Sequence, residues 1–587
     1  MRVLSRIGLA LILFSSLLSV PSAQAEENVP RKILTGWIPY YSMKTALPAA
    51  LNNTDLIKEV MPFWYTLKYS TKSKKSSITD LYTPANPSIP MSVPLAAMRS
   101  ANLQIIPTIT DGTEKGVLAG LLKEPASRSQ VVSTIMNLVR TNNFDGIDID
   151  FEGFAFVDGN ASWKATAPAW VAFIKELSVA LRAENKILSI ATPYVLDPAG
   201  KQKGYFVYAW AEIASSIDKL RIMTYDYSVA KVGPIGPLEW TERTVQYAIS
   251  IMPASKVFVG VPGYGRSWVT AVSGVCPANV AKSAKVGAKA ATFVMRDATS
   301  LAATYGATPT YDEKFGEVTF SYQQVYNGTT ASGLATSCTA SRTAWYQDTR
   351  SWATRAALVN KYRIGGITAW TLGMEEPLAM EAIRNVAKEI APDQVSAVAA
   401  IDKSAVNYGK PVEVSAQFTI KDKSPLANLP VRIEGKFLGQ ESWRLLSTAV
   451  TDLEGKVKKS ILLGRSTAIR VISDASWERT EGISAELPVE IGRELFVDAP
   501  TSIRAGSEFV ITGSIRPRTS GAIIRIEKLS GKSWVPVEFP VEQTDPQGNF
   551  SVKISGQSRG IFTFRVTLLE DQSWKAVTSP TLNIIIR

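Results

Sequence analysis

Between Ile33 and about Ile390, short β-rich runs alternate with stretches of helical periodicity, and no other feature of the chain limits its fold as strongly. Repeated strand-then-helix units predict parallel strands joined by crossover helices. Eight such units are typical of a (β/α)₈ TIM barrel, an α/β fold of about 250 residues before insertions. The main alternative is an open doubly wound sheet, and the strand count favours closure. The expected strands cover residues 33–38, 55–65, 103–109, 146–151, 187–192, 220–225, 257–261 and 366–372.

One stretch interrupts this alternation between the seventh and eighth expected strands. Residues 271–344 hold both cysteines of the chain and a strand-like run over 317–322. We interpret this stretch as a small α+β insertion on the loop face of the barrel. The barrel domain with its insertion is then expected over residues 26–392.

After Pro392 the chain consists of short alternating strands separated by Gly, Asn, Asp and Pro. Three short motifs recur there at offsets of 91, 93 and 97 residues, taken from Trp443 and Trp534, Gly455 and Gly548, and Trp477 and Trp574. Offsets of this size predict two tandem immunoglobulin-like β-sandwich domains, over 393–490 and 491–587. The recurring tryptophans are expected to pack in the cores as framework residues.

The sequence contains no histidine and only two cysteines. Ser-His and Cys-His nucleophile pairs, imidazole zinc sites and Cys₄ metal clusters are therefore excluded. Hydrolytic chemistry in this chain has to use carboxylates, tyrosine, lysine or the substrate itself. We expect no metal and no cofactor.

The first 25 residues have the pattern of a secretory signal peptide, with Arg2 and Arg6, an apolar run over 7–18 and Ala23-Gln24-Ala25. The apolar run is shorter than the roughly 20 residues of a membrane span, and no later segment is expected to span a bilayer. We therefore expect a secreted protein, extracellular or associated with the cell wall.

In an oxidising compartment the two cysteines, Cys276 and Cys338, are expected to form a disulfide that closes a long loop. The alternative is a pair of buried, unpaired thiols.

Three carboxyl side chains alternate with apolar residues at the fourth expected strand. Asp148, Asp150 and Glu152 are separated by Ile149 and Phe151, so on a strand the acids share one face and the apolar side chains the other. Three anions inside a barrel repel one another, so at least one should retain a proton at neutral pH, as a general acid requires. The alternative is a calcium loop, but such loops need glycine and polar residues between their ligands.

These residues resemble the Asp-Gly-x-Asp-x-Asp-x-Glu signature of glycoside hydrolase family 18, which contains chitinases and related β-N-acetylglucosaminidases. A second match is Met223-Thr224-Tyr225-Asp226, similar to the family's Met-x-Tyr-Asp after the sixth strand, and a third is Trp370 at the end of the eighth. The expected insertion also resembles the family's α+β insertion domain. The matches span about residues 30–390 in the family's order.

The resemblance implies a retaining, substrate-assisted mechanism. Glu152 would be the general acid and base, while Asp150 would hold the acetamido N–H and share a proton with Asp148. Tyr225 and Asp226 would align the acetamido group of the sugar.

The resemblance also implies a substrate-binding surface. Trp370 would form the floor beneath the reacting sugar, with Met223 packed under it. Other aromatic residues follow early strands and could line the cleft or belong to the core. They are Trp37, Trp64, Tyr40, Tyr41 and Tyr194. Trp268 and Trp345, near the insertion boundaries, are weaker candidates.

One departure concerns the third strand. Many family chitinases carry Ser-x-Gly-Gly there, whereas this chain has Thr108-Ile109-Thr110-Asp111. Thr108 keeps a hydroxyl near Asp148, but the glycine pair is absent. This stretch is more similar to the branch that contains spore-cortex and peptidoglycan glucosaminidases.

The expected function is therefore hydrolysis of β-1,4 bonds in a polysaccharide that contains N-acetylglucosamine, either peptidoglycan or chitin. The net charge is +12, or +10 without the leader, which suits an anionic cell-wall surface. We expect no nucleic-acid partner. Two alternatives stay open: a lectin-like protein that binds glycans without cleaving them, and a surface adhesin that acts through its terminal sandwiches.

Overall fold

The computed structural model describes residues 29–197, 203–420, 423–537, 542–556 and 558–587. The chain folds as two compact units, Met1–Ala391 and Pro392–Arg587, which are described separately. The expected signal peptide over residues 1–25 lies outside the described residues.

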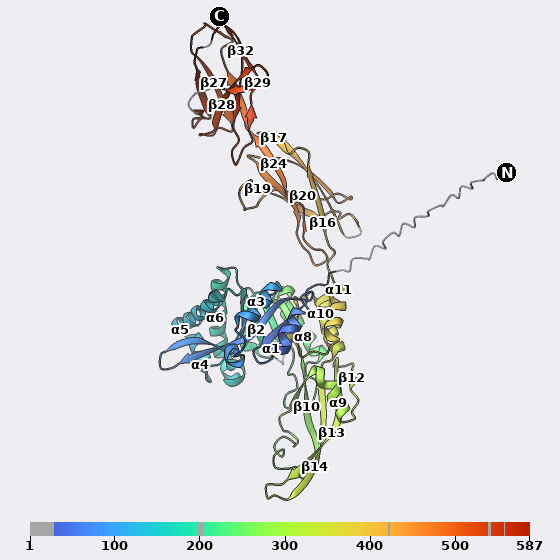
Figure 1. Ribbon diagram of the computed structural model, residues 1–587. Coiled ribbons are helices and arrows are strands. Elements are labelled where there is room, and N and C mark those ends of the chain that lie inside the picture. The colour runs from blue at the N-terminus through green and yellow to red at the C-terminus, as the bar shows by residue number, and fades with distance from the viewer. Residues whose placement is uncertain (1–28, 198–202, 421–422, 538–541, 557) are drawn as a thin grey trace, which may run out of the picture. The chain divides into compact units, whose positions relative to one another are not determined.

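The first unit contains a closed barrel of eight parallel strands (Figure 1). The barrel closes because β1 pairs in parallel with both the last strand, β15, and the second, β2. This closure confirms the TIM-like barrel and excludes the open doubly wound sheet. The barrel strands are β1 (Leu34–Pro39), β2 (Ile57–Ser70), β5 (Thr108–Asp111), β6 (Gly146–Asp150), β7 (Ile187–Pro193), β8 (Lys219–Met223), β9 (Val257–Pro262) and β15 (Gly366–Trp370).

Two barrel strands differ from expectation. The strand expected over 103–109 is divided into β4 (Gln104–Ile105) and β5, because Pro107 lies between them and has no N–H to donate to a neighbouring strand. The strand expected to end at Tyr65 continues to Ser70 and turns back as β3 (Lys75–Asp80), so β2 and β3 form a hairpin that extends beyond the barrel.

Helices surround the barrel and bury their apolar faces against it. In α6 (Trp163–Arg182), the expected stripe of Trp170, Phe173, Ile174 and Leu177 is fully buried. The other α-helices of the barrel are α1 (Met43–Leu51), α2 (Tyr82–Ala85), α3 (Ser92–Ser100), α4 (Val117–Lys123), α5 (Pro125–Thr141), α7 (Trp210–Ile213), α8 (Leu238–Ile251), α10 (Thr349–Tyr362) and α11 (Ala379–Glu389).

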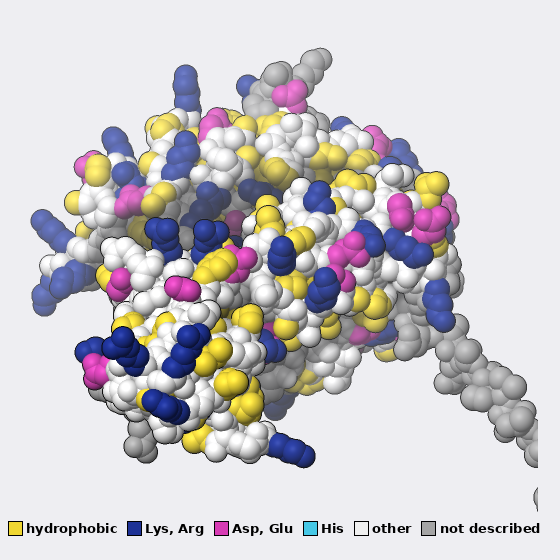
Figure 2. Space-filling model, turned by 90° about the horizontal axis from the view of Figure 1, so that it is seen from above, with side chains coloured by type: hydrophobic (Ala, Val, Ile, Leu, Met, Phe, Trp, Pro, Cys, Tyr) yellow, Lys and Arg dark blue, Asp and Glu magenta, His cyan; other side chains and the backbone are white. Residues whose placement is uncertain are grey.

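Among the described residues, no helix is both long enough and apolar enough to cross a bilayer. On the face seen in Figure 2, Lys and Arg side chains are dispersed among Asp, Glu and apolar side chains rather than merged into one basic surface.

An antiparallel sheet is inserted between β9 and β15. It begins at Tyr264 and ends at Tyr346, so it is wider than the expected 271–344, because β10 starts only two residues after β9 ends. One short helix, α9 (Ala298–Thr304), accompanies the sheet. The strand order is β11 (Ala291–Val294), β10 (Tyr264–Gly274), β14 (Ala335–Tyr346), β13 (Glu317–Thr329) and β12 (Thr310–Asp312).

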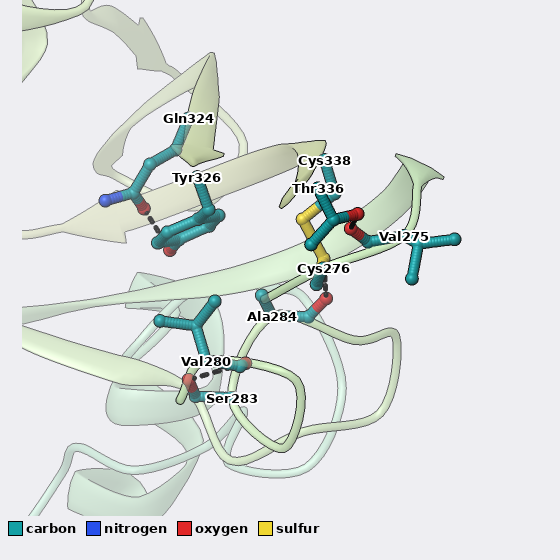
Figure 3. Close-up of a disulfide and its surroundings, with 9 residues drawn as sticks. All are labelled: Val275, Cys276, Val280, Ser283, Ala284, Gln324, Tyr326, Thr336 and Cys338. Carbon is teal, nitrogen blue, oxygen red and sulfur yellow. Dashed lines mark hydrogen bonds between the residues drawn. A yellow bond between two sulfur atoms is a disulfide. The ribbon is translucent and has the colours of Figure 1, made fainter. Parts of the chain in front are cut away.

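Cys276 and Cys338 form a disulfide within this insertion, which confirms the expected pairing and excludes two free thiols (Figure 3). The bond joins the segment that follows β10 to β14. Beside it, the Thr336 hydroxyl donates a hydrogen bond to the carbonyl of Val275 at 2.6 Å.

The second unit contains two all-β domains, each built from two packed sheets, which confirms the all-β part of the expected fold. The first has sheets of β16 (Ser396–Ile401), β18 (Pro411–Thr419) and β21 (Lys456–Leu462), and of β17 (Ala405–Asn407), β24 (Leu487–Gly492), β22 (Thr467–Ser473), β19 (Pro430–Phe437), β20 (Arg444–Val450) and β23 (Gly482–Ile483). The second has sheets of β25 (Glu494–Asp498), β27 (Phe509–Arg516) and β31 (Asn549–Ile554), and of β26 (Ser502–Ile503), β34 (Leu582–Ile586), β32 (Gly560–Leu568), β28 (Ile523–Ser530), β29 (Ser533–Pro536), β30 (Glu542–Gln543) and β33 (Val577–Thr578).

The recurring tryptophans do not all serve as core residues. Trp574 is buried and packs in the core cluster of the first domain. Trp443 and Trp534 are only partly buried, and each ring lies beneath an arginine, Arg470 or Arg565, instead. A cation over the ring face covers the apolar surface without core burial.

Candidate active site

The three acids are positioned by β6 and the turn that follows it. Asp148 lies within the strand, Asp150 ends it, and Glu152 immediately precedes a helical turn over Gly153–Val157. Ile149 is fully buried between them. The strand approaches β7 so closely at Gly146 that a Cβ atom there would lie 2.2 Å from the carbonyl oxygen of Ile187. Glycine at this position therefore sets the path of the acidic strand.

Asp148 is held by three hydrogen bonds inside the barrel. Its Oδ2 accepts from the Thr108 hydroxyl at 2.8 Å and from the Trp37 indole N–H at 3.2 Å, while Oδ1 accepts from the Ser189 hydroxyl at 2.6 Å. Burial raises the pKa of Asp148, and Arg221 together with these hydrogen bonds opposes the rise. The side chain is thus fixed in orientation, and both of its oxygens are occupied.

A fully buried arginine, Arg221, lies next to Asp148. Arg221 Nε is 3.7 Å from Asp148 Oδ1, and its Nη2 donates to Glu59 Oε1 at 2.6 Å. The Nη1 group donates to the Thr35 hydroxyl at 2.8 Å. Lys219 Nζ lies 3.4 Å from the second oxygen of Glu59. Two cations and two carboxylates therefore alternate in the barrel interior beneath the acidic strand.

Asp150 and Glu152 carry the most perturbed carboxyl groups of the site. Burial, and then the charges of Glu152 and Asp148, raise the pKa of Asp150 well above its ordinary value. Asp150 Oδ1 is buried without a hydrogen-bond partner. Burial, followed by the charge of Asp226, raises the pKa of Glu152 to about 7. A carboxyl group with this pKa can both donate and accept a proton near neutral pH.

A second group of side chains faces these acids from β8 and the insertion. Tyr225 is buried, and Asp226 adopts a left-handed backbone conformation with φ of 59°. The Tyr264 hydroxyl donates to Asp226 Oδ1 at 2.5 Å, and Arg266 Nη2 donates to the same oxygen at 2.6 Å. Tyr264 and Arg266 belong to β10, so the inserted sheet supplies the partners of a barrel-loop residue.

These side chains enclose a cavity of about 230 Å³ at the carboxyl ends of the barrel strands. Trp370 ends β15 and contacts Phe63 and Trp37 edge to face, with ring centroids 5.0 and 5.6 Å apart. Carboxyl groups and aromatic rings thus line the same cavity. The lining residues are Trp37, Phe63, Asp150, Glu152, Ala191, Met223, Tyr225, Asp226, Tyr264 and Trp370.

Most residues named from the sequence lie in or beside this cavity. Seven line it, and Asp148 and Thr108 lie directly behind the lining, in hydrogen-bond contact with each other. The seven are Glu152, Asp150, Tyr225, Asp226, Met223, Trp37 and Trp370.

The assignment of Trp64 to substrate binding is wrong. Trp64 is fully buried and packs on Tyr82, with ring centroids 4.5 Å apart, whereas the preceding residue Phe63 lines the cavity. The register between β2 and β5 shifts between Phe63 and Tyr65, so simple alternation does not hold at Trp64. Of these two aromatic residues, only Phe63 lines the cavity.

The other aromatic candidates also lie outside the cavity lining. They are Tyr40, Tyr41, Tyr194, Trp268 and Trp345. Trp268 and Trp345 pack in a cluster behind Tyr225 and Tyr264.

The sequence interpretation missed Phe63, Ala191, Tyr264 and Arg266. Tyr264 and Arg266 alternate just after the seventh barrel strand, which is the one signal that could have suggested them.

The calcium alternative does not suit this geometry. Asp148 and Asp150 lie on a regular strand rather than in a tight turn, and the oxygens of Asp148 are bound by protein donors. In the described part of the chain, no three residues among His, Cys, Asp and Glu are grouped to hold a metal ion.

The barrel and its carboxyl-lined cavity define the class of protein, a barrel glycoside hydrolase. Residues 44–375 match the profile of Glycosyl hydrolases family 18, and the chain belongs to this family. This match agrees with the resemblance carried by the acidic strand.

The chain is similar to several curated relatives. It is 26% identical over 352 residues to the putative sporulation-specific glycosylase YdhD of Bacillus subtilis, which covers 58% of this chain and 74% of the relative. It is 25% identical over 320 residues to the cortical fragment-lytic enzyme of Bacillus anthracis, covering 53% and 62%. Among solved structures, a chitinase from Chromobacterium violaceum is 22% identical with a TM-score of 0.47, covering 60% of this chain and 98% of the other.

Proposed function

We propose that the protein is an exported enzyme that cleaves β-1,4 bonds after N-acetylglucosamine by a retaining, substrate-assisted mechanism. The observation that carries the proposal is the cavity that brings Glu152 together with Asp150 and Trp370. Burial and the charge of Asp226 raise the pKa of Glu152 to about 7, which suits a proton donor. A protonated carboxyl group beside an aromatic sugar-binding surface is what acid-catalysed glycoside cleavage requires.

In the first step, Glu152 donates its proton to the glycosidic oxygen of the leaving sugar. The carbonyl oxygen of the 2-acetamido group attacks the anomeric carbon of the same sugar, and the bond to the leaving sugar breaks. The unpaired oxygen of Asp150 accepts the acetamido N–H and stabilises the positive charge of the oxazolinium ion. Tyr225 holds the acetamido group from the opposite side.

In the second step, Glu152 removes a proton from water as the water attacks the anomeric carbon. The oxazolinium ring opens, and the sugar is released with its original anomeric configuration. Glu152 is protonated again and ready for another cycle, so no external oxidant, reductant or metal takes part in the balance.

We further propose peptidoglycan rather than chitin as the polymer. Three observations support it. The net charge is +10 without residues 1–25, and the glycine pair that many family chitinases carry on the third strand is absent after Thr108. The chain is also similar to a relative named for lysis of cortical fragments. An exported enzyme at the cell wall would meet this anionic polymer directly. Chitin, which is neutral, gains nothing from the positive charge.

The test compares wild type with Glu152→Gln on chitooligosaccharides and on purified peptidoglycan, with borohydride reduction and mass spectrometry of the products. We expect new reducing-end N-acetylglucosamine from peptidoglycan, and a loss of rate of about 10²–10⁴-fold in the variant. Equal rates in the two proteins would exclude Glu152 as the acid. Binding without any new reducing end would favour the lectin-like alternative.

A further inference from the structure

Two arginines stack on one phenylalanine at an end of the first all-β domain. Phe437 ends β19, Arg444 begins β20, and Arg465 precedes β22. The guanidinium carbon of each arginine lies 3.2 Å from the centre of the Phe437 ring. Two groups at stacking distance from one ring centre have to occupy its opposite faces. The ring therefore separates two guanidinium planes and orients both.

Neither guanidinium group has an anionic partner within the described residues. The salt bridges of the same sheet involve other arginines: Arg432 pairs with Asp474 at 2.7 Å and Arg470 pairs with Glu434 at 2.9 Å. Burial, and then the charge of Arg465, lower the pKa of Arg444, so the two cations disfavour each other. An anion bound beside the ring edge, within reach of both guanidinium groups, would offset this repulsion.

The local excess of positive charge is not a property of the whole domain. Residues 393–490 contain 13 acidic and 13 basic residues, so the domain is formally neutral. The unpaired arginines are thus a local feature of one end of the sheet. A second cation–aromatic cluster lies close in sequence, where Arg470 and Lys436 approach the ring of Trp443 at 4.0 and 5.0 Å.

We propose that Phe437, Arg444 and Arg465 form a clamp that binds the phosphate or carboxylate groups of an anionic polysaccharide. Guanidinium groups bind both oxyanions through paired N–H donors, and stacking on the ring reduces the entropy lost on binding. Nucleic acid suits the site less well, because its recognition normally uses a broad basic surface and this domain is neutral. The clamp would hold the enzyme on its polymer from outside the catalytic domain.

The test measures binding of the full-length protein by isothermal titration calorimetry. The probes are polygalacturonate for carboxylate, phosphomannan for phosphate, dextran as the neutral polymer, and single-stranded DNA. We expect binding to at least one anionic polysaccharide, none to dextran, and weaker binding to DNA. The double variant Arg444→Gln/Arg465→Gln should bind the polysaccharide about tenfold or more weakly, since two charge-assisted contacts are lost.

The matched control is Arg504→Gln/Arg525→Gln, which removes the same charge from two exposed arginines of the second all-β domain. Its affinity should stay within about twofold of wild type. Phe437→Leu keeps both charges but removes the stack, and should weaken binding as well. Far-UV circular dichroism and thermal unfolding show whether each variant is folded.

Three results would overturn the clamp: equal losses in the test and control variants, unchanged affinity in Phe437→Leu, or tighter binding of DNA than of either polysaccharide. Absence of any polysaccharide binding by wild type would do so too. Because the readout is binding, it is independent of the proposed hydrolysis, and either proposal can fail alone.

Discussion

Arg221 and Glu59 form an ion pair at 2.6 Å, and both side chains are essentially removed from solvent inside the barrel. Burial raises the pKa of Glu59, but the charges of Arg221 and Lys219 outweigh that effect, and the pKa lies below its ordinary value. The same arginine approaches Asp148 from beneath. The acidic strand is therefore supported by a cation that the candidate chemistry itself does not use.

We expect Arg221→Met to lower the free energy of unfolding by about 3–5 kcal/mol, because it leaves Glu59 as a buried, partly paired anion. Urea unfolding followed by tryptophan fluorescence measures the change. The double variant Arg221→Met/Glu59→Met should regain part of the loss, because both charges are then removed together. A double variant that is no more stable than Arg221→Met alone contradicts this account.

The pH dependence of kcat/KM should report the proton on Glu152. The acid form is the proton donor, and its pKa is raised to about 7, so activity should be present below this value and lost above it. On the alkaline side, kcat/KM is expected to fall about tenfold per pH unit. Initial rates on a soluble chitooligosaccharide, measured over about two pH units on either side of the Glu152 pKa of about 7, define this limb.

The variant Asp226→Asn tests the cause of the raised Glu152 pKa in the same pH profile of kcat/KM. The charge of Asp226 contributes to the raised pKa of Glu152, so its removal should move the alkaline limb to lower pH, whatever the absolute rate. A limb that stays in place would mean that Asp226 does not act on Glu152 electrostatically.

Phe63 and Trp64 should give opposite phenotypes. Phe63→Ala removes part of the cavity wall and is expected to lower kcat/KM with a modest effect on stability, since Phe63 is only partly buried. Trp64→Ala creates an internal void and should lower the free energy of unfolding by about 3–5 kcal/mol. Steady-state kinetics and urea unfolding of both variants distinguish the two roles. If Trp64→Ala impaired kcat/KM more than Phe63→Ala in the folded protein, the assignment of the two faces would be reversed.

The disulfide should stabilise the insertion because it closes a long loop and so restricts the unfolded chain. Cys276 and Cys338 are separated by 62 residues, so Cys276→Ser/Cys338→Ser is expected to lower the free energy of unfolding by about 2–4 kcal/mol. Differential scanning calorimetry with and without dithiothreitol measures this. Reduced wild type should resemble the variant, and the variant itself should not respond to the reductant.

Much of the site could be predicted because strand geometry is periodic. Alternation along β6 is enough to separate Asp148 and Asp150 from Ile149, and no tertiary information is needed. The error at Trp64 occurs where this periodicity is interrupted, because the register between β2 and β5 shifts between Phe63 and Tyr65. The sequence alone does not fix which of two adjacent aromatic residues faces inward.

Tyr264 and Arg266 were missed for a different reason. They contact Asp226 from 38 and 40 positions further along the chain, and only the path of β10 brings them there. The arginine stack on Phe437 also joins separate elements, because Phe437 ends β19, Arg444 begins β20 and Arg465 precedes β22. Contacts of this kind depend on packing rather than on any repeat in the sequence.

Strand β10 belongs to the inserted sheet and also supplies residues to the active site, and this limits which insertions and deletions the protein can accept. Arg266, near the start of β10, donates a hydrogen bond to Asp226, while the end of β10 leads into Cys276 and its disulfide with Cys338. We expect changes in the length of the β13–β14 hairpin to leave Asp226 in place, because the turn after Thr329 lies at the opposite end of the sheet from Tyr264 and Arg266. Removal of the whole inserted sheet would instead take away Tyr264 and Arg266, the hydrogen-bond partners of Asp226 in the loop after β8. The part of the sheet next to the barrel is therefore expected to be essential, and the far hairpin is not.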